Sequence, residues 1–137
     1  SHPFTDVEPW SDRYVAYAYK KGYTKGVSST KFAPNSTVLI NDYATFVMRI
    51  LGYDDSKGDF SWDMADDFAA SKGVITAEEK AALSNGAFVR DYVVYFSRNA
   101  LRSPVKGETA RLIDKLVNKG VVSQAKLNAL DYSIWYM

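Results

Sequence analysis

Apolar residues recur at every third or fourth position in several stretches of this chain, a spacing that places them on one face of an α-helix. The clearest stripe lies in residues 40–52, at relative positions i, i+3, i+4, i+7 and i+8. Weaker stripes mark four further stretches. The sequence therefore predicts an all-α fold, a small helical bundle. The predicted helical stretches are residues 12–21, 42–51, 62–72, 88–101 and 108–119.

The first predicted helix has a marked start and a marked end. Ser11 is placed to cap the first turn with its hydroxyl, and Trp10 and Val15 hold the two positions of a hydrophobic staple. The staple predicts a packed Trp10 ring, whereas the alternative is a ring free to stack on a sugar. At the far end, Gly22 can take the left-handed conformation that closes a Schellman motif.

The glycine corner at the end of this helix recurs twice. Lys-Gly-Tyr at Gly22 becomes Lys-Gly-Val at Gly73 and again at Gly120, each time after a predicted helix. The three glycines are about 50 residues apart, a period typical of an internal structural repeat. We therefore expect residues 1–137 to form one domain of related units. These are a first unit at 4–53, a divergent second unit at 60–101 and a partial third unit at 103–131, followed by an apolar tail at 132–137.

Helix-start signals refine this organisation. Asn41 is placed to cap the second helix of the first unit. Thr76 and Glu79 have the spacing of a capping box. We therefore expect a short helix in the second unit at the place where the first unit has a loop. Ser123 is placed to cap a last short helix. The apolar tail is expected to pack against another surface, because it would otherwise form an exposed hydrophobic patch.

The composition is that of an ordinary soluble domain, with 47% hydrophobic and 24% charged residues and a formal net charge of +1. The lysines and arginines are scattered, which argues against nucleic acid or an anionic membrane as the main partner. No apolar run approaches the about 20 residues that span a bilayer, so we expect no membrane insertion. A chain of this length builds a core without a cofactor, and the absence of cysteine excludes disulfides and thiolate zinc sites.

Motifs for catalysis and metal binding are missing. The chain has no Gly-x-Ser-x-Gly, no phosphate loop and no second histidine. A paired-carboxylate glycosidase needs no sequence motif, but a small helical chain disfavours it. The acidic residues between Asp54 and Asp67 lack the spacing of a calcium loop, and a solvated turn followed by a helix start explains them. We therefore predict neither an enzyme nor a metal site.

Several anchors of the first unit appear together in a recognisable order. The chain reads Phe4-Thr-Asp-Val, then Trp10, a helix ending at Gly22, Gly26, Phe32-x-Pro34, and a second helix closing with Met-Arg-Ile-Leu-Gly52. This series resembles one S-layer homology repeat from beginning to end. The resemblance implies tandem repeats in a pseudo-threefold helical bundle. It also implies a noncatalytic role in holding bacterial surface proteins to cell-wall polysaccharide, often a pyruvylated polymer.

The family resemblance also nominates site residues. In that family a Thr-Arg-Ala-Glu signature opens the second helix, and its arginine suits an acidic sugar because a guanidinium donates two parallel hydrogen bonds to a carboxylate. The first unit has Ile40 at the arginine position, which cannot bind an anion. The second unit keeps Arg90, followed by Asp91. The candidate ligand-binding residues are Arg90, Asp91, Gly26 and Trp10.

Each candidate also has a purely structural interpretation. Arg90 can be a solvated or ion-paired helix residue, Gly26 a turn residue and Trp10 a packed ring. The leading prediction is an extracellular module that binds wall polysaccharide at the bacterial cell surface. The alternative is a structural or protein-interaction module that keeps the fold, has lost the sugar site, and binds another surface protein or a second copy through the apolar tail.

Overall fold

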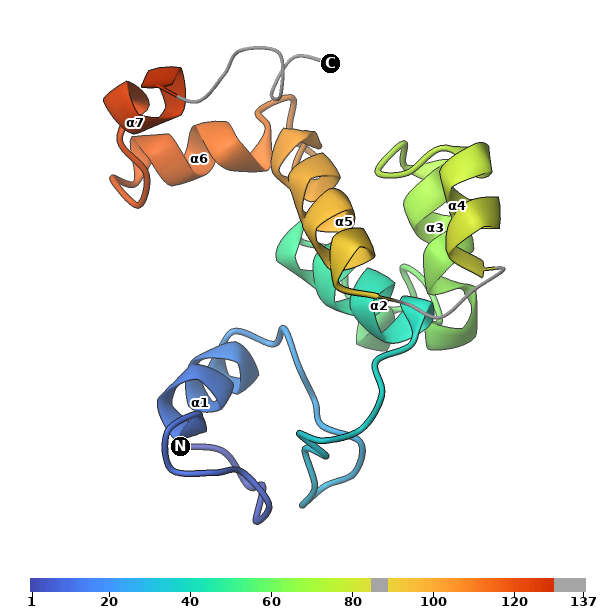
Figure 1. The fold of residues 1–137 in the computed structure, drawn as a ribbon, viewed down its shortest axis with the longest axis vertical. Helices are drawn as coiled ribbons and strands as arrows, with labels where there is room; N and C mark the ends of the chain where they lie inside the picture. The colour runs from blue at the N-terminus through green and yellow to red at the C-terminus, as the bar shows by residue number, and fades with distance from the viewer. Residues whose placement is uncertain (85–88, 130–137) are drawn as a thin grey trace.

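The computed structural model describes residues 1–84 and 89–129, and this part of the chain contains helices and loops but no strand (Figure 1). A single isolated antiparallel bridge joins Pro104 to Arg111. The predicted all-α fold is confirmed. The helices are α1 (Asp12–Lys20), α2 (Ile40–Ile50), α3 (Ala65–Ser71), α4 (Ala77–Ser84), α5 (Arg90–Arg102), α6 (Leu112–Asn118) and α7 (Gln124–Ala129), with 3₁₀ turns η1 (Asp55–Lys57) and η2 (Trp62–Met64).

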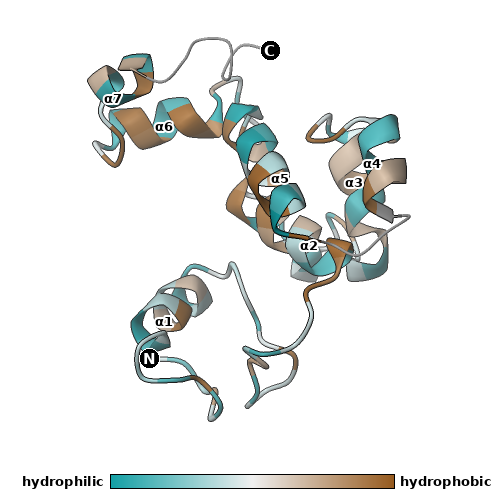
Figure 2. Cartoon of the chain, viewed as in Figure 1, coloured by the Kyte–Doolittle hydropathy of each residue, from teal (hydrophilic) through white to brown (hydrophobic). Residues whose placement is uncertain are grey.

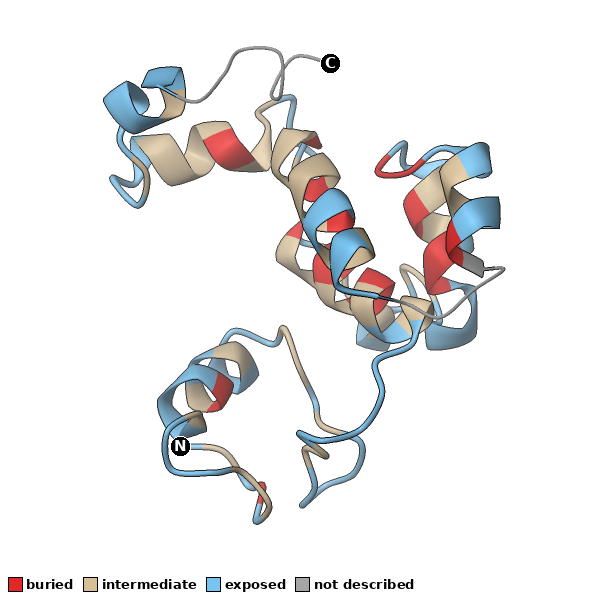
Figure 3. Ribbon diagram, in the orientation of Figure 1, coloured by how far each residue is buried: buried red, intermediate tan, exposed pale blue. Residues whose placement is uncertain are grey.

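The hydrophobic core lies around α2. This helix packs against η2, α3 and α5, while α4 packs on α3 and α6 packs on α5. The largest fully buried side chains are Met48 on α2, Leu51 directly after it and Phe96 on α5. Figure 3 shows buried positions on α2, α3 and α5. Burial of each such side chain contributes about 1.5–3 kcal/mol. Small residues at the contact of α2 with α3, Ala44 and Ala69, let the two helices approach closely.

Residues 1–39 form a small lobe beside this core (Figure 1), which we call the first lobe. Its centre is the buried Phe4 ring, which contacts the rings of Tyr19 and Phe32 with centroids 5.3 and 5.7 Å away. The Asp6 carboxylate accepts hydrogen bonds from the backbone N–H groups of Phe32 and Ala33, both at 2.9 Å. Most of α1 is hydrophilic or neutral, whereas α2 is richer in hydrophobic residues (Figure 2). The first lobe is therefore held by aromatic packing and loop hydrogen bonds.

The predicted glycine corners are confirmed. Gly22, Gly73 and Gly120 all have φ between 70 and 75°. At each corner the next residue donates a backbone hydrogen bond to the carbonyl five positions earlier, as a Schellman motif requires. The corner after α2, at Gly52, closes in the same way, with Tyr53 donating to Met48 at 3.0 Å. The same local geometry therefore ends four helices.

α1 begins at Asp12 with Ser11 as its N-cap residue, as predicted, but the expected cap by the Ser11 hydroxyl is wrong. Ser11 already has helical backbone angles, and its hydroxyl donates to the Glu8 carbonyl at 3.0 Å instead of capping the helix. A turn that begins at Glu8 therefore leads into α1. The hydrophobic staple is also wrong, because Trp10 is 77% exposed while Val15 is buried.

The predicted cap of α2 is wrong too. Leu39 is the N-cap, and its N–H donates to the Asp42 carboxylate at 2.8 Å. Asn41 instead accepts a hydrogen bond from the backbone N–H of Asp66 at 3.1 Å, in the first turn of α3. Its amide also donates to the Asp63 carbonyl. Asn41 therefore satisfies the start of α3 and ties this helix to α2.

The later helix starts are partly as predicted. The capping box at Thr76 and Glu79 and the cap at Ser123 are confirmed. The helix expected from Glu108 begins only at Leu112, because residues 104–111 form a loop closed by the Pro104–Arg111 bridge. Phe88, the first residue of the predicted helix at 88–101, and the apolar tail at 132–137 lie outside the described residues.

Replacing Gly26 with alanine should destabilise the first lobe. Gly26 has a φ of 72°, and an added Cβ would lie 2.4 Å from Phe4 Cε1 and 2.6 Å from the Lys31 carbonyl oxygen. Strain and overpacking together should lower the free energy of unfolding by about 2 kcal/mol or more, measured by chemical denaturation. Gly22→Ala is the matched control, because Gly22 has φ 75° and open space around it. Equal losses in both variants would contradict the packing role of Gly26.

Candidate functional site

The candidate ligand residues lie in three separate places. Trp10 precedes α1 on the surface, Gly26 lies in the loop after the Gly22 corner, and Arg90 and Asp91 open α5. Arg90 and Asp91 are both exposed. No hydrogen bond or ion pair joins any two of the four within the described ranges 1–84 and 89–129. The structure therefore offers separate candidate contact points.

Gly26 serves the packing of the first lobe. The space where a side chain would begin is filled by the Phe4 ring and the Lys31 carbonyl. The Gly26 N–H donates to the Thr24 hydroxyl at 3.2 Å, which holds the loop locally. A fold requirement is therefore sufficient to explain glycine at this position.

The signature position at the start of α2 has a structural role in the first unit. Ile40, which replaces the arginine, is partly buried and packs against the core. Asp42, at the glutamate position, accepts the Leu39 N–H and also the indole N–H of Trp62 at 2.9 Å. This helix start is therefore satisfied by the protein itself, whereas the side chain of Arg90 at the equivalent position of α5 extends into solvent.

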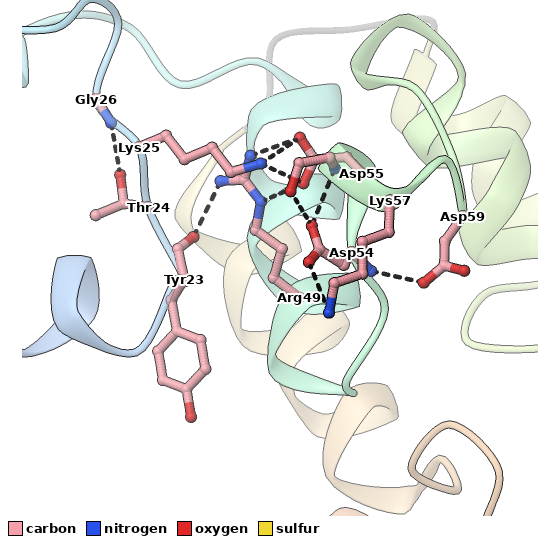
Figure 4. Close-up of polar contacts among 10 residues, drawn as sticks. Tyr23, Thr24, Lys25, Gly26, Arg49, Asp54, Asp55, Lys57 and Asp59 are labelled. Atoms are coloured by element: carbon pink, nitrogen blue, oxygen red, sulfur yellow. Dashed lines mark hydrogen bonds and ion pairs between the residues drawn. The ribbon is translucent and has the colours of Figure 1, made fainter.

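The densest group of charges lies where the corner loop of the first lobe meets the end of α2 (Figure 4). We call it the charged corner; its central residues are Lys25, Arg49 and Asp55. The Arg49 guanidinium donates two hydrogen bonds to the Asp55 carboxylate, at 2.8 and 2.9 Å. Its third nitrogen donates to the Tyr23 carbonyl at 3.3 Å. Such a two-pronged ion pair is among the stronger polar contacts in proteins.

Lys25 completes this arrangement. Its ammonium group lies 3.0 Å from both Asp55 carboxylate oxygens. The Arg49 and Asp55 side chains are only 13% and 20% exposed, whereas Lys25 is 44% exposed. The hydrogen bonds from Arg49, and next those from Lys25, hold the pKa of Asp55 far below its usual range despite partial burial. The carboxylate is thus ionised across the ordinary pH range and clamps the first lobe to α2.

The loop before α6 also contacts this corner. The backbone N–H of Lys106 donates to the Leu51 carbonyl at 2.8 Å, which satisfies a free carbonyl at the end of α2. The Lys106 ammonium pairs with Asp59, and this pair lowers the pKa of the Asp59 carboxyl. The carboxylates of this region are therefore engaged by cations and backbone N–H groups. In the ranges that the structure describes, no three acidic or histidine side chains cluster as a metal site.

Sequence reasoning missed Arg49, Asp55 and Lys25 as a group. Asp55 belongs to an acidic stretch, and the sequence pattern alone predicts a solvated turn there. Lys25 is remote in sequence from both partners. The available signal was the pairing of an arginine in the last turn of α2 with an aspartate directly after the Gly52 corner, because a Schellman corner turns the chain back beside the helix end. The exposed aromatic residues on α1 were also missed, because the sequence pattern alone does not show which side chains the packing leaves exposed.

Removing the central carboxylate should loosen the first lobe. Asp55→Asn leaves the partly buried Arg49 without an anion, so the free energy of unfolding should fall by about 2 kcal/mol at pH 7. The depressed pKa of Asp55 predicts stabilisation that is complete above about pH 5 and declines as pH drops through about 4. Denaturant unfolding of wild type and variant between pH 3 and pH 7 checks both points. A variant as stable as wild type at pH 7, or an unchanged difference at pH 3, would contradict the clamp.

Comparison with known proteins connects this geometry to a family. Residues 3–39 match the sequence model of the S-layer homology domain, and this range is the first lobe with its lead-in, α1 and corner loop. Neither the curated proteins nor the solved structures include a match to the chain. Within residues 1–84 and 89–129, no helix has the length and apolar character needed to cross a membrane. S-layer homology domains are generally noncatalytic anchoring modules of bacterial cell surfaces, and the match supports the predicted resemblance to that family over residues 3–39.

Proposed function

We propose that this chain is a noncatalytic module that attaches a bacterial surface protein to a polysaccharide of the cell wall. The observation that carries the proposal is the S-layer homology match, which coincides with a complete structural lobe. Its characteristic residues have clear roles, since Asp6 holds the Phe32 loop and Gly26 accommodates Phe4. We place the module outside the cell, at the cell wall.

Arg90 is the best-placed residue for an acidic sugar. It occupies the first turn of α5, where free backbone N–H groups and the helix dipole favour an anion. Its guanidinium is exposed and can donate two parallel hydrogen bonds to a carboxylate, such as that of a pyruvylated sugar. The neighbouring Asp91 carboxylate can accept hydrogen bonds from sugar hydroxyl groups. The exposed Trp10 ring supplies a stacking face elsewhere on the surface.

The second candidate is a structural or protein-interaction module without a sugar site. Packing of Ile40 against the core at the signature position favours it, because the first unit has replaced an anion-binding group with a core contact. On this alternative, the chain binds another surface protein or a second copy of itself. Light scattering over a concentration series separates the two, because concentration-dependent association is expected only for the alternative.

Sedimentation with purified bacterial cell walls tests the polysaccharide. We expect the chain to sediment with intact walls and to remain in solution with walls from which the secondary polysaccharide has been extracted. Equal retention on both wall preparations would contradict the proposed ligand.

Arg90→Ala should weaken binding to intact walls by about tenfold, because a charge-assisted contact with a sugar carboxylate is lost. Arg102→Ala, at the opposite end of α5, is the control and should bind like wild type. Binding isotherms from the sedimentation assay give both affinities. An unchanged affinity for Arg90→Ala would remove this residue from the site.

A further inference from the structure

One side of α1 carries large aromatic rings that the fold leaves in water. Trp10, Tyr14 and Tyr17 are 77%, 56% and 59% exposed. The spacing of three residues places Tyr14 and Tyr17 along one side of α1, and Trp10 lies just before the helix. Figure 3 shows α1 as largely exposed, and Val15 is its buried residue. This is an unusual concentration of exposed aromatic surface on a single short helix.

Two cations lie within this row of rings. The Arg13 guanidinium lies 4.7 Å from the centre of the Tyr14 ring and donates to its hydroxyl at 2.6 Å. The Lys21 ammonium lies 5.8 Å from the centre of the Tyr17 ring. Over the described residues, no carboxylate forms an ion pair with either cation. We define the α1 face as Trp10, Arg13, Tyr14, Tyr17 and Lys21.

Folding of the first lobe does not require the α1 face. The helix packs through its other side, where Val15 is buried and the Tyr19 ring contacts Phe4. The one acidic residue in the first turn, Asp12, is engaged by His2 at 3.1 Å. The α1 face thus combines exposed rings with positive charge that is not neutralised by the described part of the chain.

We propose that the α1 face binds an anionic polysaccharide along the length of the helix. This inference rests on the proposed function and adds a contact surface to it, separate from Arg90. Tyrosine and tryptophan rings offer rigid, amphipathic surfaces at low entropic cost, which suits stacking on the apolar face of a sugar ring. Arg13 and Lys21 stand between or beside these rings, where they can pair with carboxylate or phosphate groups of the same polymer.

Charge favours a polysaccharide over a second copy of the chain. A symmetric dimer through the α1 face would bring Arg13 and Lys21 against the same cations of the partner, an unfavourable arrangement. The cations also interrupt the apolar surface, whereas the centre of a protein interface is usually depleted of charge. A polymer that carries negative charge at intervals matches both the rings and the cations.

The test uses the whole chain and polysaccharide extracted from purified bacterial cell walls, titrated by calorimetry. The variant Tyr14→Ala/Tyr17→Ala should bind at least about tenfold more weakly than wild type. Alanine favours helix, so α1 should persist in this variant, and circular dichroism checks it. Val94→Ala, which changes a 65% exposed apolar residue on α5, is the control and should bind like wild type.

A second variant tests the cations. Arg13→Gln/Lys21→Gln should weaken binding at low salt and reduce the dependence of affinity on salt concentration. If wild type fails to bind the polysaccharide, the proposed function and the α1 face are both overturned. If wild type binds and all variants bind equally, only the α1 face is overturned. Sedimentation equilibrium of the protein alone tests whether the α1 face binds a second copy of the chain. If wild type self-associates and Tyr14→Ala/Tyr17→Ala does not, the face belongs to a second copy and the proposal is overturned.

Discussion

The two-pronged ion pair between Arg49 and Asp55 is the contact on which the arrangement of this chain depends. The first lobe has its own small aromatic centre and lies beside the main core, so it needs a specific attachment. Arg49 supplies it by binding Asp55 and the Tyr23 carbonyl together, and Lys25 adds a second cation from the lobe. The end of α2 thus becomes a junction at which the first lobe, η1 and the loop before α6 meet.

This junction determines which charges remain for a ligand. Arg49, Lys25 and Lys106 are engaged by carboxylates of the corner, so they are poor candidates for an external anion. The cations that we propose for a ligand lie instead at the start of α5, with Arg90, and on the α1 face. At the start of α5, Arg90 lies in a helix turn that favours anions. On the α1 face, the cations lie beside aromatic rings that can stack on sugars. The proposed binding surfaces therefore lie away from the groups that hold the fold together.

Local features of this chain were predictable from sequence, whereas contacts between units were not. The Schellman corner at Gly22 and its copies follow from helix-end geometry, which involves only neighbouring residues. The capping box at Thr76 is local in the same sense. Asn41 has the chemistry of a cap, but it caps α3 instead of its own helix because packing brings the Asp66 N–H within reach. Likewise, the exposure of Trp10 depends on how the lobe folds, and the pseudo-threefold arrangement and the site residues remain predictions.

Amide hydrogen exchange of the full chain, with and without wall polysaccharide, tests most directly whether a rigid frame presents separate sugar-binding surfaces. We predict slower exchange in α1 and in the first turn of α5 when the polysaccharide is present, with unchanged exchange around Arg49 and Asp55. Identical exchange in both conditions, or protection confined to the charged corner, would contradict this assignment.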